Sequence, residues 1–409
     1  TKQLDFYKNQ FVSIRRASSK NIFVLFIEKA IALLKANSIL CFIVPEGLFE
    51  TKSYSDCAKL IYEQGRVETV VKFQERVFED AVTGNIIFKF IKNLSNTESR
   101  YFLWTKDKTL QEIEKHTDSV TKKMEENKSV TIKEIALLFK GMVVKDRKAA
   151  LSHENKNALT PDVFLLGNCM NRYAVTDKYY CDYSLLEIIG GTKDKRKYDL
   201  FPRILIRRTG DRLCCSLLDY QALTESTLYS LVLTSAACHL KFLLALFNSA
   251  LYTYYIRQKM LTNQQMFPQI LMTDLQELPV KIVTSEHQQP FIEKTDIMRS
   301  KNRELHELKS DFLNFVKSEL APQKISKKLE NWHELDWDGF KKELAKCKVR
   351  IKELSLKERR EWQSYFAGQK EIAAEIASVI ENTDREIDQT VYELYGLTEE
   401  EIKIVENAA

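Results

Sequence analysis

Glycine is scarce in this 409-residue chain, with eleven residues in all, and proline is scarcer, with seven. No two glycines are separated by a single residue, so the Gly-x-Gly turn of a dinucleotide or methyl-donor site is absent. The phosphate loop of nucleoside triphosphatases, Gly-x-x-x-x-Gly-Lys-Ser/Thr, is absent too. The sequence therefore carries no signature of a nucleotide-binding turn.

Adjacent prolines are also missing, which excludes the motif Asn-Pro-Pro-Tyr. In adenine methylation, that asparagine and a proline carbonyl accept the amino hydrogens of a flipped base, and the tyrosine stacks on it. A Pro-Asp pair followed by a correctly spaced Glu-x-Lys, the usual set of a metal-dependent nuclease, is not found either. Neither reaction can be assigned to residues of this sequence.

Eight cysteines are dispersed without a Cys-x-x-Cys pair, which argues against a zinc site. A chain of this size has its own cores and shows no secretory signal, so we expect buried free thiols instead of disulfides. No apolar run approaches the roughly 20 residues of a membrane span. The six histidines are isolated, and we interpret them as core or surface residues. These features predict a cytoplasmic protein with no metal and no membrane contact.

The composition is that of a folded chain, with 44% hydrophobic and 11% aromatic residues. Lysine and arginine total 62 and the acidic residues 57, a net charge of +5. That excess does not by itself imply nucleic-acid binding, but it leaves room for a basic patch on one face.

Residues 1–100 alternate helices and strands. An apolar helical stripe at 21–35, which includes Phe26, predicts a helix with one buried face. It is followed by the almost wholly apolar run 38–45, which is typical of a strand buried on both faces. A helix at 53–63 and strands at 66–73 and 85–91 complete the closing half of a doubly wound α/β sheet, without its opening half. Residues 101–130 are polar and predict a charged helix or linker.

Residues 131–285 predict a mostly β domain with helices packed on it. Short strand-like runs occur at 163–166, 203–208, 213–218 and 228–233, with one apolar helix at 240–259. Residues 286–409 predict a coiled-coil-like helical hairpin, because apolar residues recur there at spacings of three and four. Ser355 and Glu358 predict a capping box that starts one of its helices. Its apolar stripes fit either internal packing or a partner interface, including a dimer through these helices.

Several segments resemble known proteins in one order along the chain. Residues 21–61 (NIFVLFIEKAIALLKANSILCFIVPEGLFETKSYSDCAKLI) and 67–93 (VETVVKFQERVFEDAVTGNIIFKFIKN) resemble the part of gamma-class N6-adenine DNA methyltransferases just after the catalytic motif. Residues 201–211 (FPRILIRRTGD), 243–260 (LLALFNSALYTYYIRQKM) and 267–280 (FPQILMTDLQELPV) look like a TaqI-like target-recognition domain. Residues 328–337 (KLENWHELDW) and 383–406 look like the helical tail of fused restriction–modification enzymes.

The resemblance implies a catalytic α/β domain, a recognition domain and double-stranded DNA in the cleft between them. It also implies S-adenosylmethionine as the methyl donor of the complete enzyme. Because the catalytic motif is absent here, none of the family's catalytic or donor-binding residues can be carried over. We therefore expect no catalytic residue and no bound donor in this chain, and a catalytic N-terminal half on the same or a separate polypeptide.

Within the middle domain, Arg203, Arg207 and Arg208 flank a tight turn at 209–211. Alternation along a strand predicts that Arg203 and Arg207 face outward. Arg207 or Arg208 could then contact a phosphate or the O6 and N7 of a guanine. A solvated surface hairpin explains the same residues.

Three further groups are candidate DNA contacts. Basic loops can hold phosphates, and amide side chains can read adenine through N6 and N7, although ordinary solvated loops have the same composition. The candidates are Lys193, Lys195, Arg196 and Lys197 after a Gly-Gly pair, Lys140, Lys145, Arg147 and Lys148 around Gly141, and Asn263, Gln264 and Gln265.

Two functions fit the sequence. One is sequence-specific recognition of duplex DNA, which positions it for N6-adenine methylation by the missing catalytic half. The other is a structural module that docks onto a partner subunit without reading DNA.

Overall fold

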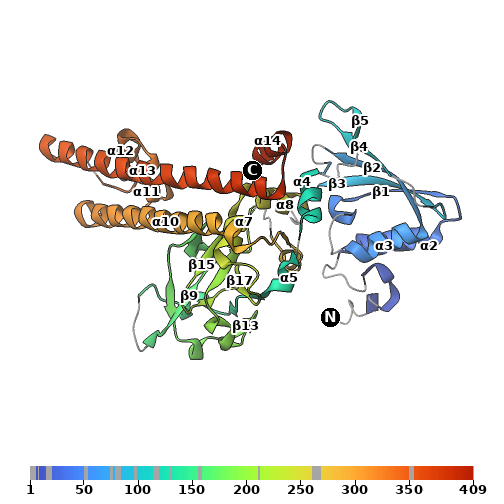
Figure 1. Cartoon of the computed structure of the whole chain (residues 1–409), viewed down its shortest axis with the longest axis horizontal. Coiled ribbons are helices and arrows are strands. Elements are labelled where there is room, and N and C mark those ends of the chain that lie inside the picture. Colours follow the sequence, from blue (N-terminus) through green and yellow to red (C-terminus); the bar gives the residue numbers. More distant parts are fainter. Residues whose placement is uncertain are drawn as a thin grey trace. The chain divides into compact units, whose positions relative to one another are not determined.

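The computed structural model describes residues 6–7, 9–14, 21–49, 54–73, 77–78, 84–95, 99–113, 119–128, 130–154, 159–210, 212–259, 269–349 and 354–408. The chain forms two compact units, whose elements are labelled in Figure 1. Unit 1 comprises residues 1–126, 209–212 and 254–274, and unit 2 comprises residues 127–208, 213–253 and 275–409.

Unit 1 is built on a five-stranded sheet in the order β1-β3-β2-β4-β5. Strands β1 (Ile39–Pro45) and β2 (Gly65–Phe73) are both antiparallel to β3 (Asn85–Lys92), which lies between them. β3 follows β1 and β2 in sequence but lies between them in the sheet. Because both neighbours oppose β3, β1 and β2 run parallel to each other, as expected for the end of a doubly wound sheet.

One face of this sheet is covered by α2 (Phe23–Leu33) and α3 (Ser55–Gln64). Alternate residues of the strands point into that core, for example Phe88 and Phe90 of β3. The helices and strands lie where the sequence predicts them, but Phe26, which we expected on the inner face of its helix, is exposed.

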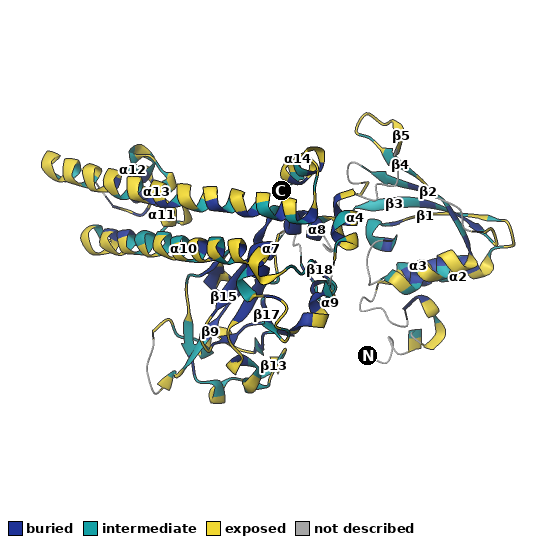
Figure 2. Cartoon of the chain, viewed as in Figure 1, coloured by how far each residue is buried: buried dark blue, intermediate teal, exposed yellow. Residues whose placement is uncertain are grey.

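Strand β1 is only partly buried, so the prediction of burial on both faces is wrong. Ile39 and Ile43 are 54% and 40% exposed, whereas Val44 is buried. The physical reason is position: β1 is the edge of the described sheet, and α2 and α3 pack on one of its faces only (Figure 2).

Residues 101–130, predicted as a charged helix or a linker, contain strands as well as a helix. They contain most of β4 (Arg100–Trp104), all of β5 (Leu110–Ile113) and α4 (Ser119–Glu126). β4 pairs in parallel with β2, and β5 pairs antiparallel with β4. The segment therefore extends the sheet instead of leaving it.

The β part of unit 2 is centred on a four-stranded antiparallel sheet in the order β15-β14-β17-β7. Its strands are β7 (Ala136–Lys140), β14 (Arg203–Arg207), β15 (Cys215–Leu218) and β17 (Leu228–Leu233). A three-stranded sheet, β12-β9-β16, packs beside it. Its members are β9 (Asp162–Leu165), β12 (Tyr179–Cys181) and β16 (Leu223–Thr224).

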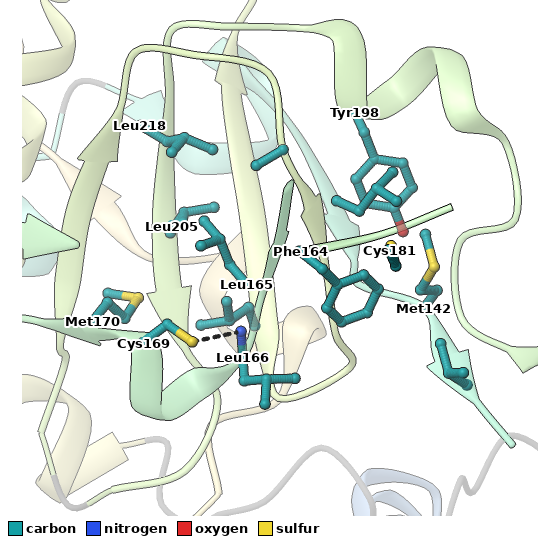
Figure 3. Close-up of a cluster of buried hydrophobic side chains, with 14 of the residues drawn as sticks. Met142, Phe164, Leu165, Leu166, Cys169, Met170, Cys181, Tyr198, Leu205 and Leu218 are labelled. Carbon is teal, nitrogen blue, oxygen red and sulfur yellow. Dashed lines mark hydrogen bonds between the residues drawn. The ribbon is translucent and has the colours of Figure 1, made fainter. Parts of the chain in front are cut away.

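A hydrophobic core joins these sheets, and Figure 3 shows part of it. Phe164 and Tyr198 are fully buried there beside Leu205 and Met142. The backbone N–H of Leu166 donates to Cys169 Sγ at 3.3 Å, which fixes the turn η5 (Gly167–Cys169) after β9. The turn after β9 is thus part of this core.

Smaller strands complete the β part. They are β6 (Val130–Thr131) paired with β18 (Pro279–Val280), β8 (Val143–Val144) paired with β13 (Ile188–Gly190), and β10 (Met170–Asn171) paired with β11 (Ala174–Val175). Short helices connect them: α5 (Ile132–Ile135), α6 (Arg147–Ala150), η6 (Tyr183–Leu185) and η7 (Lys195–Asp199).

The predicted apolar helix at 240–259 is two helices, α7 (Leu240–Asn248) and α8 (Ala250–Lys259), separated by Ser249. Ser249 has an extended backbone with ψ of 158°, and its hydroxyl donates to Leu246 O at 2.7 Å. A serine that bonds locally to the preceding turn competes with helical hydrogen bonding. The sequence pattern did not reveal this break.

The C-terminal part is a helical hairpin, as predicted. Helices α10 (Ser285–Leu320) and α13 (Leu356–Tyr395) lie side by side and run antiparallel (Figure 1). Their connection contains α11 (Lys327–Glu330), η8 (Trp332–Glu334) and α12 (Trp337–Lys346). Phe312 stacks on Trp332 there, with ring centroids 3.9 Å apart. The predicted capping box of Ser355 and Glu358 is confirmed at the start of α13.

All eight cysteines are free thiols, and seven of them are buried, as predicted. Among the described residues, no cluster of side chains could hold a metal ion. No helix in the described part of the chain combines the length and the apolar character needed to cross a membrane.

Candidate nucleic-acid interface

Arg203 lies inside unit 2, so the expectation that it faces outward is wrong. Its side chain is fully buried, and its guanidinium donates to the carbonyls of Tyr198 at 2.8 Å, Leu200 at 2.9 Å and Ala222. Burial lowers the pKa of Arg203 to about 10. Strand β14 is paired on both edges, and four of its five residues are buried. Side chains on both faces of this strand are therefore buried, and alternation does not leave one set exposed to solvent. Arg203 therefore holds the end of η7 against the sheet.

Arg207 is also engaged by the backbone. Its Nε donates to Gly167 O at 2.9 Å, and a terminal nitrogen donates to Met170 O. The planar fork that we expected to point at a guanine instead spans the two ends of the turn η5. In this structure Arg207 positions that turn.

Arg208 and Lys140 lie on opposite sides of β17. The backbone N–H of Arg208 donates to Thr227 O at 2.9 Å, and Lys140 of β7 is paired in register with Tyr229. Both side chains are half-buried. Burial and the neighbouring Arg208 charge lower the pKa of Lys140, and the Glu225 carboxylate acts in the opposite direction. Two residues from separate predicted groups thus come close together.

The basic loop 193–197 is folded, with η7 as its second half. Lys195 forms an ion pair with Asp162 at 2.8 Å and lies over the ring of Tyr183, 5.1 Å from its centroid. Arg196, 88% exposed, pairs with Asp194 at 3.0 Å. These two cations are therefore partly neutralised within the chain.

Lys193 and Lys197 differ from those two residues. Neither forms an ion pair with any residue that the structure describes, and Lys193 is exposed. The Tyr183 hydroxyl donates to Lys193 O at 2.5 Å, and the buried Tyr198 donates to Thr192 O at 2.8 Å. The backbone next to these two lysines is thus fixed by hydrogen bonds from two tyrosines.

The second basic cluster is joined to this loop by the pairing of β8 with β13. Gly190 pairs with Val143, and the N–H of Lys145 donates to Glu187 O at 3.0 Å. Gly191 has φ of 73°, and a Cβ added to it would lie 2.1 Å from Gly141 O. Gly191 and Gly141 are both needed here, because a Cβ on Gly141 would lie 2.1 Å from Glu225 O.

We call this surface the basic edge of unit 2. Lys145 is paired with Glu187 at 2.7 Å, and Arg147 and Lys148 are exposed on α6. The basic edge consists of Lys140, Lys145, Arg147, Lys148, Lys193, Lys195, Arg196, Lys197 and Arg208.

Asn263, Gln264 and Gln265 lie outside the described residues, so their prediction stays open. The segment that follows them is described: Gln269 forms an antiparallel bridge with Thr209, and both residues belong to unit 1. The turn after Arg208 and the chain that follows the amide run are thereby brought together, which their 60-residue separation in sequence did not reveal.

Two glycines of unit 1 are closely packed against other parts of the unit. In unit 1, a Cβ on Gly65 would lie 2.2 Å from Ile91 O, and one on Gly84 would lie 2.4 Å from the Glu46 carboxylate. These glycines permit close internal packing and form no open turn that could cradle a ligand. No donor-binding residue is therefore assigned.

Three protein families match successive parts of this chain. Residues 1–78 match the Eco57I restriction-modification methylase family, and residues 162–280 match the TaqI-like C-terminal specificity domain. Residues 284–391 match a domain of unknown function, which coincides with most of the helical hairpin. The order of the first two matches confirms the predicted relationship to restriction–modification methyltransferases. The gamma class and its adenine specificity stay predictions.

Two individual relatives match a short stretch of sequence. The Type II methyltransferases M.HincII and M.HindII, both from Haemophilus influenzae, are each 36% identical over 77 residues. The match covers 18% of this chain and 15% of either relative.

The fold of the chain is similar to that of a solved restriction–modification enzyme. The Type IIL restriction-modification enzyme MmeI, determined in complex with DNA, aligns with a TM-score of 0.53 over 96% of this chain and 52% of its own. At 9% identity, this likeness concerns the fold alone. The chain thus spans about half the length of MmeI.

Proposed function

We propose that this chain recognises a specific sequence in double-stranded DNA on behalf of a restriction–modification methyltransferase. The observation that carries the proposal is the coincidence of the TaqI-like specificity domain at 162–280 with the part of unit 2 that bears most of the basic edge. MmeI, which shares the fold, was solved with DNA bound. Exposed cations on a rigid β framework suit the phosphates of a duplex.

The residues of the basic edge differ in whether another side chain of the protein already pairs with them. Lys193, Lys197, Arg147 and Lys148 would neutralise phosphates, since no ion pair within the described residues engages them. Lys195 and Arg196 would contribute less, because each is already paired with an aspartate. Arg203 and Arg207 would act indirectly, by holding the η7 and η5 turns in place.

Base reading belongs, in this proposal, to residues near Thr209 and Gly210 and to Asn263, Gln264 and Gln265. The bridge between Thr209 and Gln269 supports placing these segments together. Amide side chains can pair with the N6 and N7 of adenine. The complete enzyme would then transfer a methyl group from S-adenosylmethionine to the N6 of an adenine, using catalytic residues outside this chain.

A fluorescence-anisotropy titration of duplex DNA tests the proposal. We expect log K to fall linearly with log salt, and calorimetry to detect no S-adenosylmethionine binding by the chain alone. Micromolar binding of the donor would contradict the assignment of catalysis to another part of the enzyme. Absence of DNA binding at low salt would contradict the recognition function itself.

A second function is favoured by one observation on the hairpin. Phe315, Ile372 and Val379 are 41%, 44% and 39% exposed, and Ile372 and Val379 are seven residues apart on α13. Exposed apolar residues at heptad spacing are typical of a helix that docks onto another helix. In that alternative, the chain is an assembly module, and it would bind a partner subunit tightly without reading DNA.

A further inference from the structure

Ile189 is a large apolar residue on the surface among the cations of the basic edge. Its side chain is 59% exposed, whereas Ile188, the residue before it, packs against the hydrophobic core of unit 2. Lys145 bonds to Glu187, two residues before Ile189, and the exposed Lys193 follows four residues after it. A single exposed isoleucine is common on protein surfaces, so exposure alone assigns it no role.

The backbone at Ile189 forms a β-bulge. β13 and β8 make a two-stranded ribbon, in which Ile188 is paired with Val144 and Gly190 with Val143. Between these two described strands, Ile189 is left without a partner and is the extra residue of β13. A bulge bends its strand and redirects a side chain, and bulges are frequent beside functional sites. The exposed isoleucine therefore stands at the residue where the ribbon departs from regular pairing.

The chain on either side of the bulge is fixed. Before it, the Glu187 carbonyl accepts the Lys145 N–H at 3.0 Å. After it, Gly191 lies against the backbone of Gly141, where an added Cβ would be 2.1 Å from the carbonyl oxygen. A side chain carried by a backbone that is already ordered loses less freedom when it binds, and so it suits a specific contact.

We propose that Ile189 contacts the C5 methyl group of a thymine in the major groove of the bound duplex. That groove admits a two-stranded β-ribbon, and the methyl group is the apolar feature that distinguishes thymine there. Ile189 lies within the segment that matches the TaqI-like specificity domain. The exposed cations of the basic edge bind phosphates and set the position of the ribbon. This inference rests on the proposed function and adds an apolar base contact to the amide contacts proposed above.

Selection of duplexes from a randomised pool, with the wild-type chain and Ile189→Ala, is the first test. We expect the variant to lose its preference at one thymine of the enriched motif and to keep the rest. Its affinity for that motif should fall roughly 3- to 10-fold with an unchanged salt slope, because a methyl contact releases no counterion. Ile297→Ala is the matched control: Ile297 is 44% exposed on α10, and its replacement should change neither motif nor affinity.

Deoxyuridine, which differs from thymidine only by the missing methyl group, tests the contact itself. Each thymine of the enriched motif is replaced in turn, and affinity is measured by fluorescence anisotropy. We expect the wild-type chain to bind roughly 3- to 10-fold more weakly when one particular thymine is replaced. Ile189→Ala should bind the two duplexes equally, whereas Ile189→Val, which keeps a branched apolar side chain, should retain most of the discrimination.

The outcomes separate this inference from the function on which it rests. A motif without thymine, or one that tolerates deoxyuridine at every position, would overturn the methyl contact and leave sequence recognition standing. An unchanged motif in Ile189→Ala would overturn it as well, and so would a lower salt slope, which would indicate that Ile189 only positions the neighbouring cations. A wild-type chain that enriches no motif would contradict the recognition function itself, and the base contact with it.

Discussion

Asp384 of α13 binds both terminal nitrogens of the Arg172 guanidinium, at 2.6 and 2.8 Å. Arg172 lies between β10 and β11 and also donates to Asn248 O, the last residue of α7, at 2.6 Å. The Asn248 side chain in turn bonds both backbone groups of Cys215 in β15. The helical hairpin is thereby fixed to the β part of unit 2 through one arginine.

Replacing Asp384 with Ala should destabilise unit 2 by about 2–4 kcal/mol, because it leaves a largely buried guanidinium without its counter-charge. Urea denaturation followed by tryptophan fluorescence measures this, since Trp332, Trp337 and Trp362 all lie within the hairpin segment. The control is Glu304→Ala, which removes the exposed partner of Lys301 and should change stability by less than about 1 kcal/mol. Equal effects of the two changes would contradict a structural role for Arg172 and Asp384.

Asp388, one turn further along α13, makes the stability of the protein depend on pH. Its Oδ1 accepts the Ala250 N–H at 2.7 Å, at the start of α8. Burial raises the pKa of Asp388 to about 6; the Ala250 N–H acts in the opposite direction, and the Asp384 charge raises it further. Between pH 4 and 6, Asp388 therefore keeps its proton in the folded chain but has lost it in the unfolded chain. The contribution of Asp388 to the free energy of unfolding therefore decreases as the pH rises from 4 to 6 and stays constant at higher pH.

The substitution Asp388→Asn keeps an oxygen for Ala250 and removes the charge. The stability of the variant relative to wild type should increase from pH 4 to 6 and then remain level. Parallel denaturation series at several pH values measure the difference. A difference that stays flat across this window would show that Asp388 does not have the raised pKa.

Arg203 and the basic edge should respond differently to charge removal. Arg203→Met leaves two buried backbone carbonyls and one partly buried carbonyl without this donor, at a cost of about 2–4 kcal/mol. Below its lowered melting temperature, the folded variant should lose only the part of its DNA affinity that depends on the position of η7, and its salt slope should be unchanged, because Arg203 contacts no phosphate. Lysine should rescue stability only in part, because one ammonium cannot reproduce the planar fork. Loss of DNA affinity at full stability would return Arg203 to the binding surface.

Single substitutions along 193–197 should separate the available cations from the paired ones. Lys193→Ala and Lys197→Ala should weaken binding to all duplexes alike and reduce the salt slope by about one unit each. Lys195→Ala and Arg196→Ala should have smaller effects, because Asp162 and Asp194 already neutralise these side chains. Four equal slopes would show that the intramolecular ion pairs do not persist when DNA binds.

Strong periodic patterns allowed much of the fold to be predicted from sequence. The strand at 228–233 was predicted with its observed bounds, and the capping box at Ser355 marked the start of α13 correctly. Both depend on local residue types, which the sequence states directly. The helix break at Ser249 was missed, because it depends on a hydroxyl bond that periodicity does not encode.

The candidate site was harder to predict, because its residues meet through long-range pairing. β8 and β13 are two and three residues long, too short for a periodic signal, yet their pairing joins the two basic groups. Alternation along β14 gave the wrong direction for Arg203, since a central strand with both faces covered has no outward side. The proximity of Lys140 and Arg208 likewise depends on strand order, which no local pattern gives.

Selection of bound duplexes from a randomised pool tests the central claim most directly. The wild-type chain and the Lys193→Ala variant are compared at physiological salt. Sequence-specific recognition predicts that the wild-type chain enriches one short motif and that the variant enriches the same motif with lower yield, because Lys193 contacts phosphate and reads no base. Recovery of duplexes without any shared motif, at an affinity no better than that for random DNA, would contradict the claim and favour the assembly module.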